Sequence, residues 1–166
     1  MESIYKRRSI RKYTDKQVDE ELILKVIKAG MNAPSARNIM PWHFVVINER
    51  SLLDSIPTFQ QYSQMLLEAQ CAILICIDKQ LQPIEGYWGA DGGAATQNML
   101  LEIENLGLGG VWLGIYPIEH RMEGMVGLLN LPGNIIPFSL ISIGYPDETK
   151  EPNNKYFQEK IHLNKW

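Results

Sequence analysis

The sequence predicts an α+β fold in which helices flank a small central sheet. Segments with helical periodicity outnumber those with the pattern of a strand. Their order is not a regular alternation of strand and helix, which argues against a doubly wound parallel sheet. The run from Cys71 to Ile77 is apolar throughout, so both faces of that strand should be covered. Together these observations favour one central sheet, mixed or antiparallel, with helices packed against it.

Periodicity and helix boundaries predict the elements of the first half of the chain. Asp19 is a typical N-cap for a strong helix, in which apolar residues recur at helical spacing as far as Met31. Pro57 should break the helical stretch that follows the first strand. The predicted order is a short helix over 2–8, the helix that starts at Asp19, a loop over 32–41, a strand over 42–47 and one or two helices over 49–69.

The second half predicts two helices and two further strands after the buried one. A helix runs from about Trp88 to Leu106 and is stopped by Gly107, since glycine commonly ends helices. The glycine-rich segment that follows enters a strand that ends near residue 115. A helix over 119–129 and a last strand from 135 to about Tyr145 complete the fold.

The bulk composition is that of a globular protein. The 166 residues are 45% hydrophobic and 21% charged, and the formal net charge is −3. That balance gives no general attraction to nucleic acid or to an anionic membrane, and no apolar stretch has the length of a bilayer span. The N-terminal residues lack the apolar core of a secretory signal. We therefore expect a cytoplasmic protein, with one domain over residues 1–166 and a C-terminal arm from about residue 150.

The cysteines and histidines predict neither a disulfide nor a metal site. Cys71 and Cys76 are five residues apart in one strand, so their side chains should point to opposite faces. At about 3.3 Å per residue they are roughly 16 Å apart, too far for a disulfide. No His/Cys cluster has the spacing of metal ligands. His43 and Tyr62 are interpreted as core residues, although either could face a site.

A basic run near the N-terminus is the first candidate for a ligand site. Five of the seven residues from Lys6 to Lys12 are cationic, in a chain of net negative charge. Arginine presents a planar fork of donors that suits a phosphate, and Ser9 adds a hydroxyl group. A solvated charged surface is the more common explanation of such a run on its own. A nucleic-acid-binding arm is a third explanation, which the acidic composition disfavours.

The loop from Pro34 to Trp42 is the second candidate. Its two prolines fix the backbone between a helix and a strand. Ser35 and Asn38 offer neutral donors and acceptors of the kind that read the edge of a heterocycle. A helix-terminal loop, with Trp42 packed at the entrance of the strand, explains the same residues equally well.

Small residues dominate two later segments. Six of the seven residues from Gly89 to Ala95 are Gly or Ala, and each glycine costs up to about 1 kcal/mol of helix propensity. Close approach to a ligand, to a partner helix or to the core would compensate for that cost. The glycines from Gly107 to Gly114 would let a strand approach a planar ligand, but their spacing is not that of a phosphate-binding GxGxxG loop.

The motifs of enzymes that carry their own nucleophile or metal are absent from the sequence. We find no GxSxG elbow, no HExxH motif and no convincing Ser/His/Asp or Cys/His set. Loops suited to a ligand, without an evident nucleophile, are typical of proteins whose chemistry is carried by a cofactor.

Taken in order, these segments resemble the flavin-dependent nitroreductase family. RRSIRKY (7–13) resembles the family's Arg-x-Ser-x-(Arg/Lys) opening, and PSARNIMPWHFVVI (34–47) resembles its Pro-Ser-x-x-Asn-x-x-Pro-Trp loop and strand. The resemblance continues through DGGAATQNMLLEIENLGLGGVWLG (91–114), LISIGYP (140–146) and KYFQEKIHLNKW (155–166), so it covers nearly the whole chain.

The resemblance implies a homodimer with two sites for flavin mononucleotide (FMN) at the subunit interface, each built from both chains. The positions that match the phosphate and one edge of the flavin are Arg7, Ser9 and Arg11, with Arg8 between them acting through its backbone. The loop that matches the other subunit's contribution contains Pro34, Ser35, Ala36 and Asn38. The backbone that matches the segment past the flavin, with an N–H near Gly114 directed at N5, is that of Trp112, Leu113, Gly114 and Ile115. Lys155 falls where the family often has a second phosphate-binding cation, and the arm over 157–166 would wrap the partner subunit.

The activity implied is that of an NAD(P)H oxidoreductase with a ping-pong mechanism. NADH or NADPH would reduce FMN and leave, and a nitroaromatic, a quinone or a similar acceptor would enter at the same face. No side chain is required as a catalytic residue, and no metal takes part. The alternative is an FMN-binding carrier or sensor without efficient turnover. The sequence departs from the family pattern at Met40, at Gly114 and in the short segment 78–89, which predicts a more open flavin face.

Overall fold

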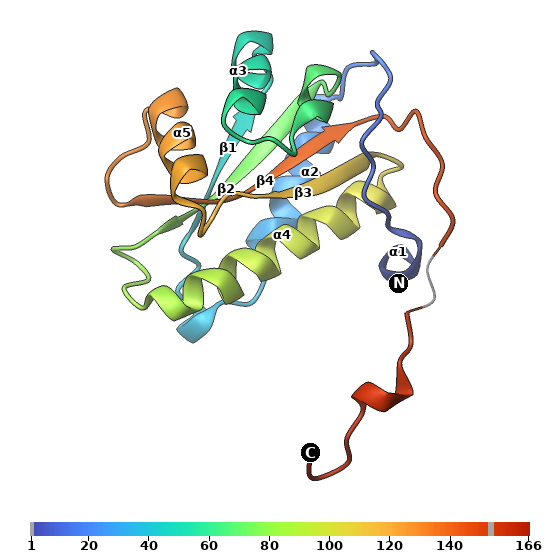
Figure 1. Ribbon diagram of the computed structural model, residues 1–166, viewed down its shortest axis with the longest axis vertical. Helices are drawn as coiled ribbons and strands as arrows, with labels where there is room; N and C mark the ends of the chain where they lie inside the picture. The colour runs from blue at the N-terminus through green and yellow to red at the C-terminus, as the bar shows by residue number, and fades with distance from the viewer. Residues whose placement is uncertain (1, 153–154) are drawn as a thin grey trace.

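The computed structural model describes residues 2–152 and 155–166, and its centre is a four-stranded antiparallel sheet. The strands are β1 (Trp42–Ile47), β2 (Cys71–Asp78), β3 (Gly109–Gly114) and β4 (Ile135–Gly144), and their order across the sheet is β1-β2-β4-β3. All three strand pairs are antiparallel, so of the two sheet types expected the antiparallel one is present. The α+β fold predicted from the sequence is confirmed (Figure 1).

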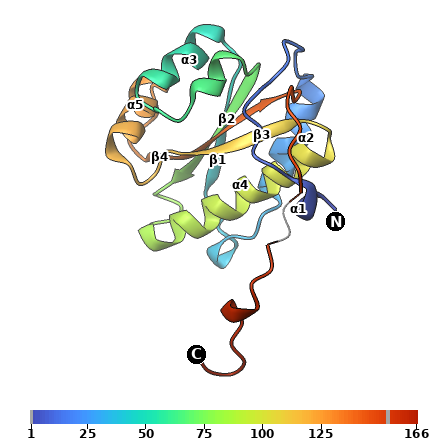
Figure 2. The same cartoon turned by 45° about the vertical axis from the view of Figure 1, so that its right-hand side comes forward.

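Helices cover both faces of the sheet. The helices α2 and α4 lie on one face, and α3 and α5 lie on the other (Figures 1 and 2). The α-helices are α1 (Ser3–Lys6), α2 (Glu20–Met31), α3 (Arg50–Ser55), α4 (Trp88–Asn105) and α5 (Glu119–Leu129). The 3₁₀ turns are η1 (Ala36–Asn38), η2 (Ile56–Thr58), η3 (Gln64–Leu67), η4 (Glu85–Tyr87) and η5 (Gln158–Lys160).

Strand β2 separates two hydrophobic cores. Cys71, with its neighbours at every second position, packs toward α2 and α4, whereas Leu74 and Cys76 pack in the core that includes Leu53 of α3 and Met125 of α5. The two cysteines therefore lie on opposite faces, as the alternation of side chains predicts. Both are free, and burial raises the pKa of each thiol to about 12. Both are buried residues of the hydrophobic cores.

Close packing explains some of the small residues, whereas a Cβ at Gly89, Gly107 or Gly114 would meet nothing within 4 Å. A Cβ added at Gly92 would lie 2.5 Å from the ring of Phe138, so the first turns of α4 need glycine to approach β4. A Cβ at Gly109 would lie 2.7 Å from Ile10, and one at Gly144 would lie 2.8 Å from Tyr13. These glycines let the N-terminal segment cross the ends of β3 and β4. The core explanation therefore holds for Gly92, and the N-terminal segment, not a ligand, fills the space above Gly109.

Several boundaries and exposures differ from the sequence-based expectations. The first helix covers only Ser3–Lys6 instead of 2–8, and Met31, expected on the buried face of α2, is 51% exposed because Gly30 takes the buried position there. The interpretation of Tyr62 and His43 as core residues is wrong, since both are exposed. Gly107 follows α4 with a φ of 71°, as a helix-stopping glycine should.

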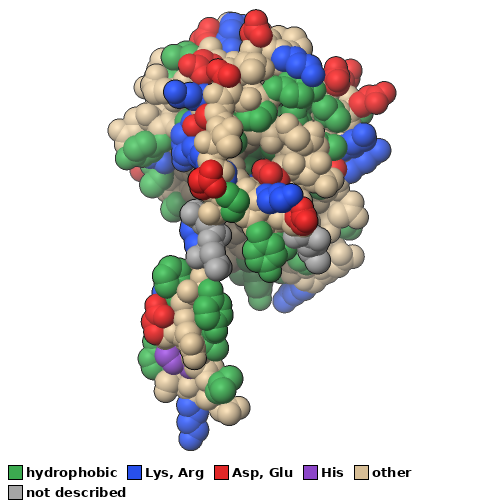
Figure 3. Space-filling model, turned by 90° about the vertical axis from the view of Figure 1, so that its right-hand side faces the viewer, with side chains coloured by type: hydrophobic (Ala, Val, Ile, Leu, Met, Phe, Trp, Pro, Cys, Tyr) green, Lys and Arg blue, Asp and Glu red, His purple; other side chains and the backbone are tan. Residues whose placement is uncertain are grey.

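The C-terminal arm, as far as it is described, extends away from the sheet and its helices (Figures 1 and 3). Its residues from 155 to 166 are exposed throughout. Large apolar side chains make up much of its surface, and they are Tyr156, Phe157, Ile161, Leu163 and Trp166. In the part of the chain that the structure describes, no helix is both long and apolar enough to cross a membrane.

Candidate functional site

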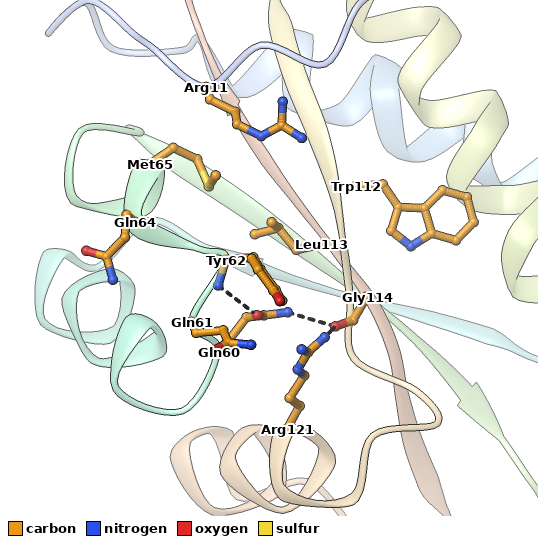
Figure 4. Close-up of a pocket in the computed structure, with 10 residues that line it drawn as sticks. All are labelled: Arg11, Gln60, Gln61, Tyr62, Gln64, Met65, Trp112, Leu113, Gly114 and Arg121. Atoms are coloured by element: carbon orange, nitrogen blue, oxygen red, sulfur yellow. Dashed lines mark hydrogen bonds between the residues drawn. The ribbon is translucent and has the colours of Figure 1, made fainter.

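A hollow of about 460 Å³ lies along the outer edge of β3, on the side where α3 and α5 pack (Figure 4). Its volume is within the range typical of small-molecule and cofactor sites. The N-terminal segment, the turns between α3 and β2, strand β3 and the start of α5 all contribute to it. The residues that line it are Arg11, Gln60, Gln61, Tyr62, Gln64, Met65, Trp112, Leu113, Gly114 and Arg121.

The outer edge of β3 presents backbone groups to this hollow. The peptide groups of alternate residues in a strand point to the same side. The carbonyl oxygen of Gly110 accepts a hydrogen bond from the N–H of Ile10, 3.1 Å away and outside the sheet, so the peptide groups of Trp112 and Gly114 point outward as well. A Cβ added at Gly114 would meet nothing within 4 Å, so the space beside its Cα is open. The edge can therefore read a planar ligand through its backbone.

The carbonyl of Gly114 is held by two side chains from different elements. The amide nitrogen Nε2 of Gln60 donates to it over 2.8 Å, and Nη1 of Arg121 donates to it over 3.0 Å. Gln60 is 1% exposed, and its own Oε1 accepts the backbone N–H of Tyr62 over 3.1 Å. This clamp, drawn as dashed lines in Figure 4, fixes the orientation of a glycine peptide that would otherwise be free to turn.

The charge that lines the hollow is positive. The guanidinium carbon of Arg121 lies 5.5 Å from the ring centroid of Tyr62, a cation–π geometry. Its Nε is buried and has no hydrogen-bond partner among the described residues. Arg11 lies at the opposite end (Figure 4), and no Asp or Glu of the described part of the chain lines the hollow. Two cations without a lining acid favour an anionic or electron-rich ligand.

Glu148 and Lys150 hold the backbone that carries Arg11. The backbone N–H of Arg11 donates to Oε1 of Glu148, and this bond is the main reason that the pKa of Glu148 is lowered. The Lys150 ammonium lies 3.1 Å from the same carboxylate and donates to the carbonyl of Ser9 over 2.6 Å. The backbone of Arg11 is thus fixed by residues near the chain's other end, while its side chain remains free to contact a ligand.

The rest of the predicted phosphate segment lies beside the hollow without lining it. The guanidinium of Arg8 donates to three backbone carbonyls, those of Tyr5, Arg7 and Glu151, so its side chain is occupied. Ser9 forms a parallel bridge with Gly110. Arg7 is half-buried and lies outside the lining. Lys155 is exposed in the C-terminal arm.

The second predicted segment forms a separate hollow of about 280 Å³. Pro34, Ser35 and Ala36 line it, opposite residues from η4 and the start of α4. Asn38 is exposed nearby. Within one chain, the structure therefore brings Arg11, Trp112, Leu113 and Gly114 together and keeps the loop apart from them. Ile115 is fully buried and donates its N–H to Phe138 over 3.3 Å, so it faces the core.

Sequence reasoning missed several residues that line the first hollow. Gln60 begins a polar run, QQYSQ, between Pro57 and the buried strand β2. A polar run next to an apolar strand could have indicated residues that line a site. Arg121 occupies the first turn of α5, where the helix dipole disfavours a cation, which suggests a role other than helix stability. Among the described residues, no group of three or more His, Cys, Asp or Glu side chains could hold a metal ion.

Comparison with known proteins identifies the family. The model of the nitroreductase family matches residues 4–145. The chain is 46% identical over 166 residues to a protein of Methanothermobacter thermautotrophicus named "Putative NADH dehydrogenase/NAD(P)H nitroreductase", with 100% of this chain and 87% of the relative covered.

Two solved structures extend the likeness over nearly the whole chain. An FMN-dependent nitroreductase from Clostridium difficile superposes with a TM-score of 0.91 at 29% identity, covering 99% of this chain and 98% of that one. A structure from Desulfovibrio desulfuricans, described as a "putative nitroreductase in complex with fmn", gives a TM-score of 0.85 at 30% identity, covering 99% and 96%. The chain belongs to the nitroreductase family.

Proposed function

We propose that the chain binds FMN in the hollow along β3 and works as a homodimeric NAD(P)H oxidoreductase of the nitroreductase type. The observation that carries the proposal is the open edge of β3, whose outward peptide groups lie between Arg11 and Arg121 with no acid in the lining. The relatives support it, because solved structures that match nearly the whole chain are described as FMN-dependent or as complexes with FMN.

The residues present fit the chemical character of FMN. A flavin has a planar ring with polar atoms along its edge and a phosphate at the end of its chain. The N–H of Gly114 would meet N5 at that edge, next to the Gly114 carbonyl that Gln60 and Arg121 hold. Arg11, with Arg7 and Ser9 beside it, would hold the phosphate or the adjacent edge, since a guanidinium binds phosphate oxygens with charge-assisted bonds.

Bound FMN would supply the hydride chemistry that connects NADH or NADPH to an electron acceptor. The chain's own residues orient the ring and set its electrostatic surroundings. Arg121 places positive charge beside the Gly114 peptide, which favours negative charge on a ligand there. Among the described residues, no Asp, Glu or His lines the hollow. We therefore propose no side chain of the lining as a catalytic base.

A homodimer would bring the two predicted halves of the site together. One chain holds Arg11 and the β3 edge in one hollow, and it holds Pro34, Ser35 and Ala36 in another. We propose that the loop from Pro34 to Asn38 completes the partner's site. The arm that carries Lys155 would wrap the partner, which would cover apolar side chains that the single chain leaves exposed.

One observation favours the alternative of a flavin carrier or sensor. Between β2 and α4, the structure has only the 3₁₀ turn Glu85–Tyr87, in place of a longer covering segment. An open site could hold flavin without excluding water from the reaction.

Steady-state oxidation of NADH and NADPH, with a quinone or nitrofurazone as acceptor, separates the two functions. We expect turnover more than about a hundredfold above that of free FMN at the same concentration, a small part of what enzymes commonly achieve. Turnover equal to that of free FMN would contradict the enzyme and favour the carrier.

A further inference from the structure

We propose that Asp91, which lies outside the first hollow, is the positioning residue that holds the loop from Pro34 to Pro41 in its ligand-ready conformation. The proposal rests on the proposed function, because it assigns that loop to the partner's FMN site. Asp91 lies on α4, and no pattern in the sequence suggested that it contacts this loop.

The loop is conformationally strained. Arg37 and Asn38 each have a φ of 56°, and Met40 has a φ of 53°. Three residues of four therefore adopt the left-handed region, although none of them is glycine. Such conformations cost free energy and persist only where the surroundings enforce them, commonly at ligand-binding sites.

Asp91 supplies the enforcing contact from outside the loop. Its Oδ1 accepts the backbone N–H of Ala36 over 2.8 Å, and its Oδ2 accepts Nε2 of Gln82 over 3.1 Å. Within the loop, the backbone N–H of Met40 donates to Oγ of Ser35 over 2.8 Å. Two backbone hydrogen bonds also lie within the loop, from Asn38 N–H to the carbonyl of Ser35 over 3.0 Å and from Ile39 N–H to that of Ala36 over 3.2 Å. Asp91 adds the anchor that ties this loop to α4.

The carboxylate is buried and caps no helix, although it lies in the first turn of α4, where the helix dipole favours an acid. Asp91 is 2% exposed, and no cation among the described residues lies within 4.0 Å of it. Its hydrogen bonds go to the loop and to Gln82, and α4 has no side-chain cap. Since a buried charge without a cation is expensive, its retention indicates a specific task, which here is to hold Ala36.

The same contact shapes the second hollow. Asp91 stands where the loop meets α4, with Pro34, Ser35 and Ala36 on one wall and Tyr87, Ala90 and Ala94 on the other. Gln82 is 1% exposed, and its backbone carbonyl accepts a hydrogen bond from Nε1 of Trp88 over 2.8 Å, which ties the start of α4 to the same anchor. Loss of the Asp91 contact would let the loop relax and would change both walls.

Two substitutions remove the anchor from opposite sides. Asp91→Ala removes the acceptor. Ala36→Pro removes the donor and leaves Asp91 in place, at the start of a 3₁₀ turn where proline is tolerated and after a residue already in an extended conformation. Asp91→Asn keeps an oxygen for Ala36 and tests rescue. Thr96→Val is the matched control, because Thr96 is fully buried on the same helix and bonds to Ser139 over 2.7 Å, away from the loop.

Two quantities are measured on the full-length protein. One is hydrogen exchange of the backbone amides between Pro34 and Pro41, and the other is the dissociation constant of FMN. We expect Asp91→Ala and Ala36→Pro each to speed exchange and to weaken FMN binding about tenfold or more, the loss expected for a hydrogen bond to a charged group. Asp91→Asn should stay within about threefold of the parent, and Thr96→Val should lower thermal stability without changing either readout.

The proposal is overturned if Asp91→Ala leaves exchange or FMN affinity unchanged, or if Thr96→Val reproduces both losses. If Asp91→Ala does not fold, Ala36→Pro decides by the same two measurements. A parent protein that takes up no FMN would contradict the proposed function instead, and the exchange data would then decide alone whether Asp91 holds the loop.

Discussion

Replacing Arg11 with alanine is expected to weaken the retention of FMN by roughly tenfold to a hundredfold, since a charge-assisted hydrogen bond contributes about 1.5–3 kcal/mol. Arg11 is the one residue of the predicted phosphate segment whose side chain lines the hollow along β3. Its backbone N–H bonds to Glu148, and that bond survives the substitution. The change therefore removes the guanidinium from the site and leaves the segment in place.

The dissociation constant of FMN, measured by recovery of flavin fluorescence, checks this expectation. Lys12→Ala is the matched control, because Lys12 is the next cation along the chain, is exposed and does not line the hollow. It should bind FMN as the parent does. Equal affinity of the Arg11→Ala variant and the parent would show that the phosphate site is misplaced.

Deletion of Phe157–Trp166 is expected to raise the dissociation constant of the homodimer at least about a hundredfold. The deleted residues include Phe157, Ile161, Leu163 and Trp166, which are 50%, 54%, 85% and 102% exposed in the single chain. Burial of each large apolar side chain contributes about 1.5–3 kcal/mol, so the arm as a whole would carry much of the association free energy. Figure 3 shows hydrophobic side chains along the arm, which projects from the body of the protein.

Sedimentation velocity over a range of protein concentrations measures the effect. A finer pair of variants keeps the length of the arm: three apolar residues, Phe157, Ile161 and Leu163, are changed to serine in one, and three polar residues, Gln158, Glu159 and Lys160, are changed to serine in the other. Only the first should dissociate. A deletion variant that sediments like the parent would rule out a wrapping arm.

The elements of the fold could be predicted from the sequence because their signals are local. The apolar run of β2 and the glycine after α4 each mark an element by neighbouring residues alone, and both are found where expected. The strand order β1-β2-β4-β3 could not be predicted, because pairing joins segments far apart in the chain. The close contact between Gly109 and Ile10 could not be predicted either, because these residues are also far apart in the chain.

The candidate site likewise contains residues that local motifs predict and residues that only long-range contacts bring together. Arg11 and Gly114 belong to motifs with recognisable spacing, and the structure places both at one hollow. Gln60 and Arg121 meet at the carbonyl of Gly114 from positions 54 and 7 residues away, and no spacing rule connects them. The anchor from Asp91 to Ala36 spans 55 residues. Such contacts become visible only when the strands are assembled.

The visible absorption spectrum of the purified protein, recorded before and after anaerobic addition of NADH and of NADPH, tests the central claim most directly. We predict a flavin spectrum that bleaches with at least one of the two nucleotides, because the proposed site would hold FMN where a nicotinamide donor could reach it. A colourless protein that also fails to take up added FMN would contradict the proposed cofactor and the activity built on it.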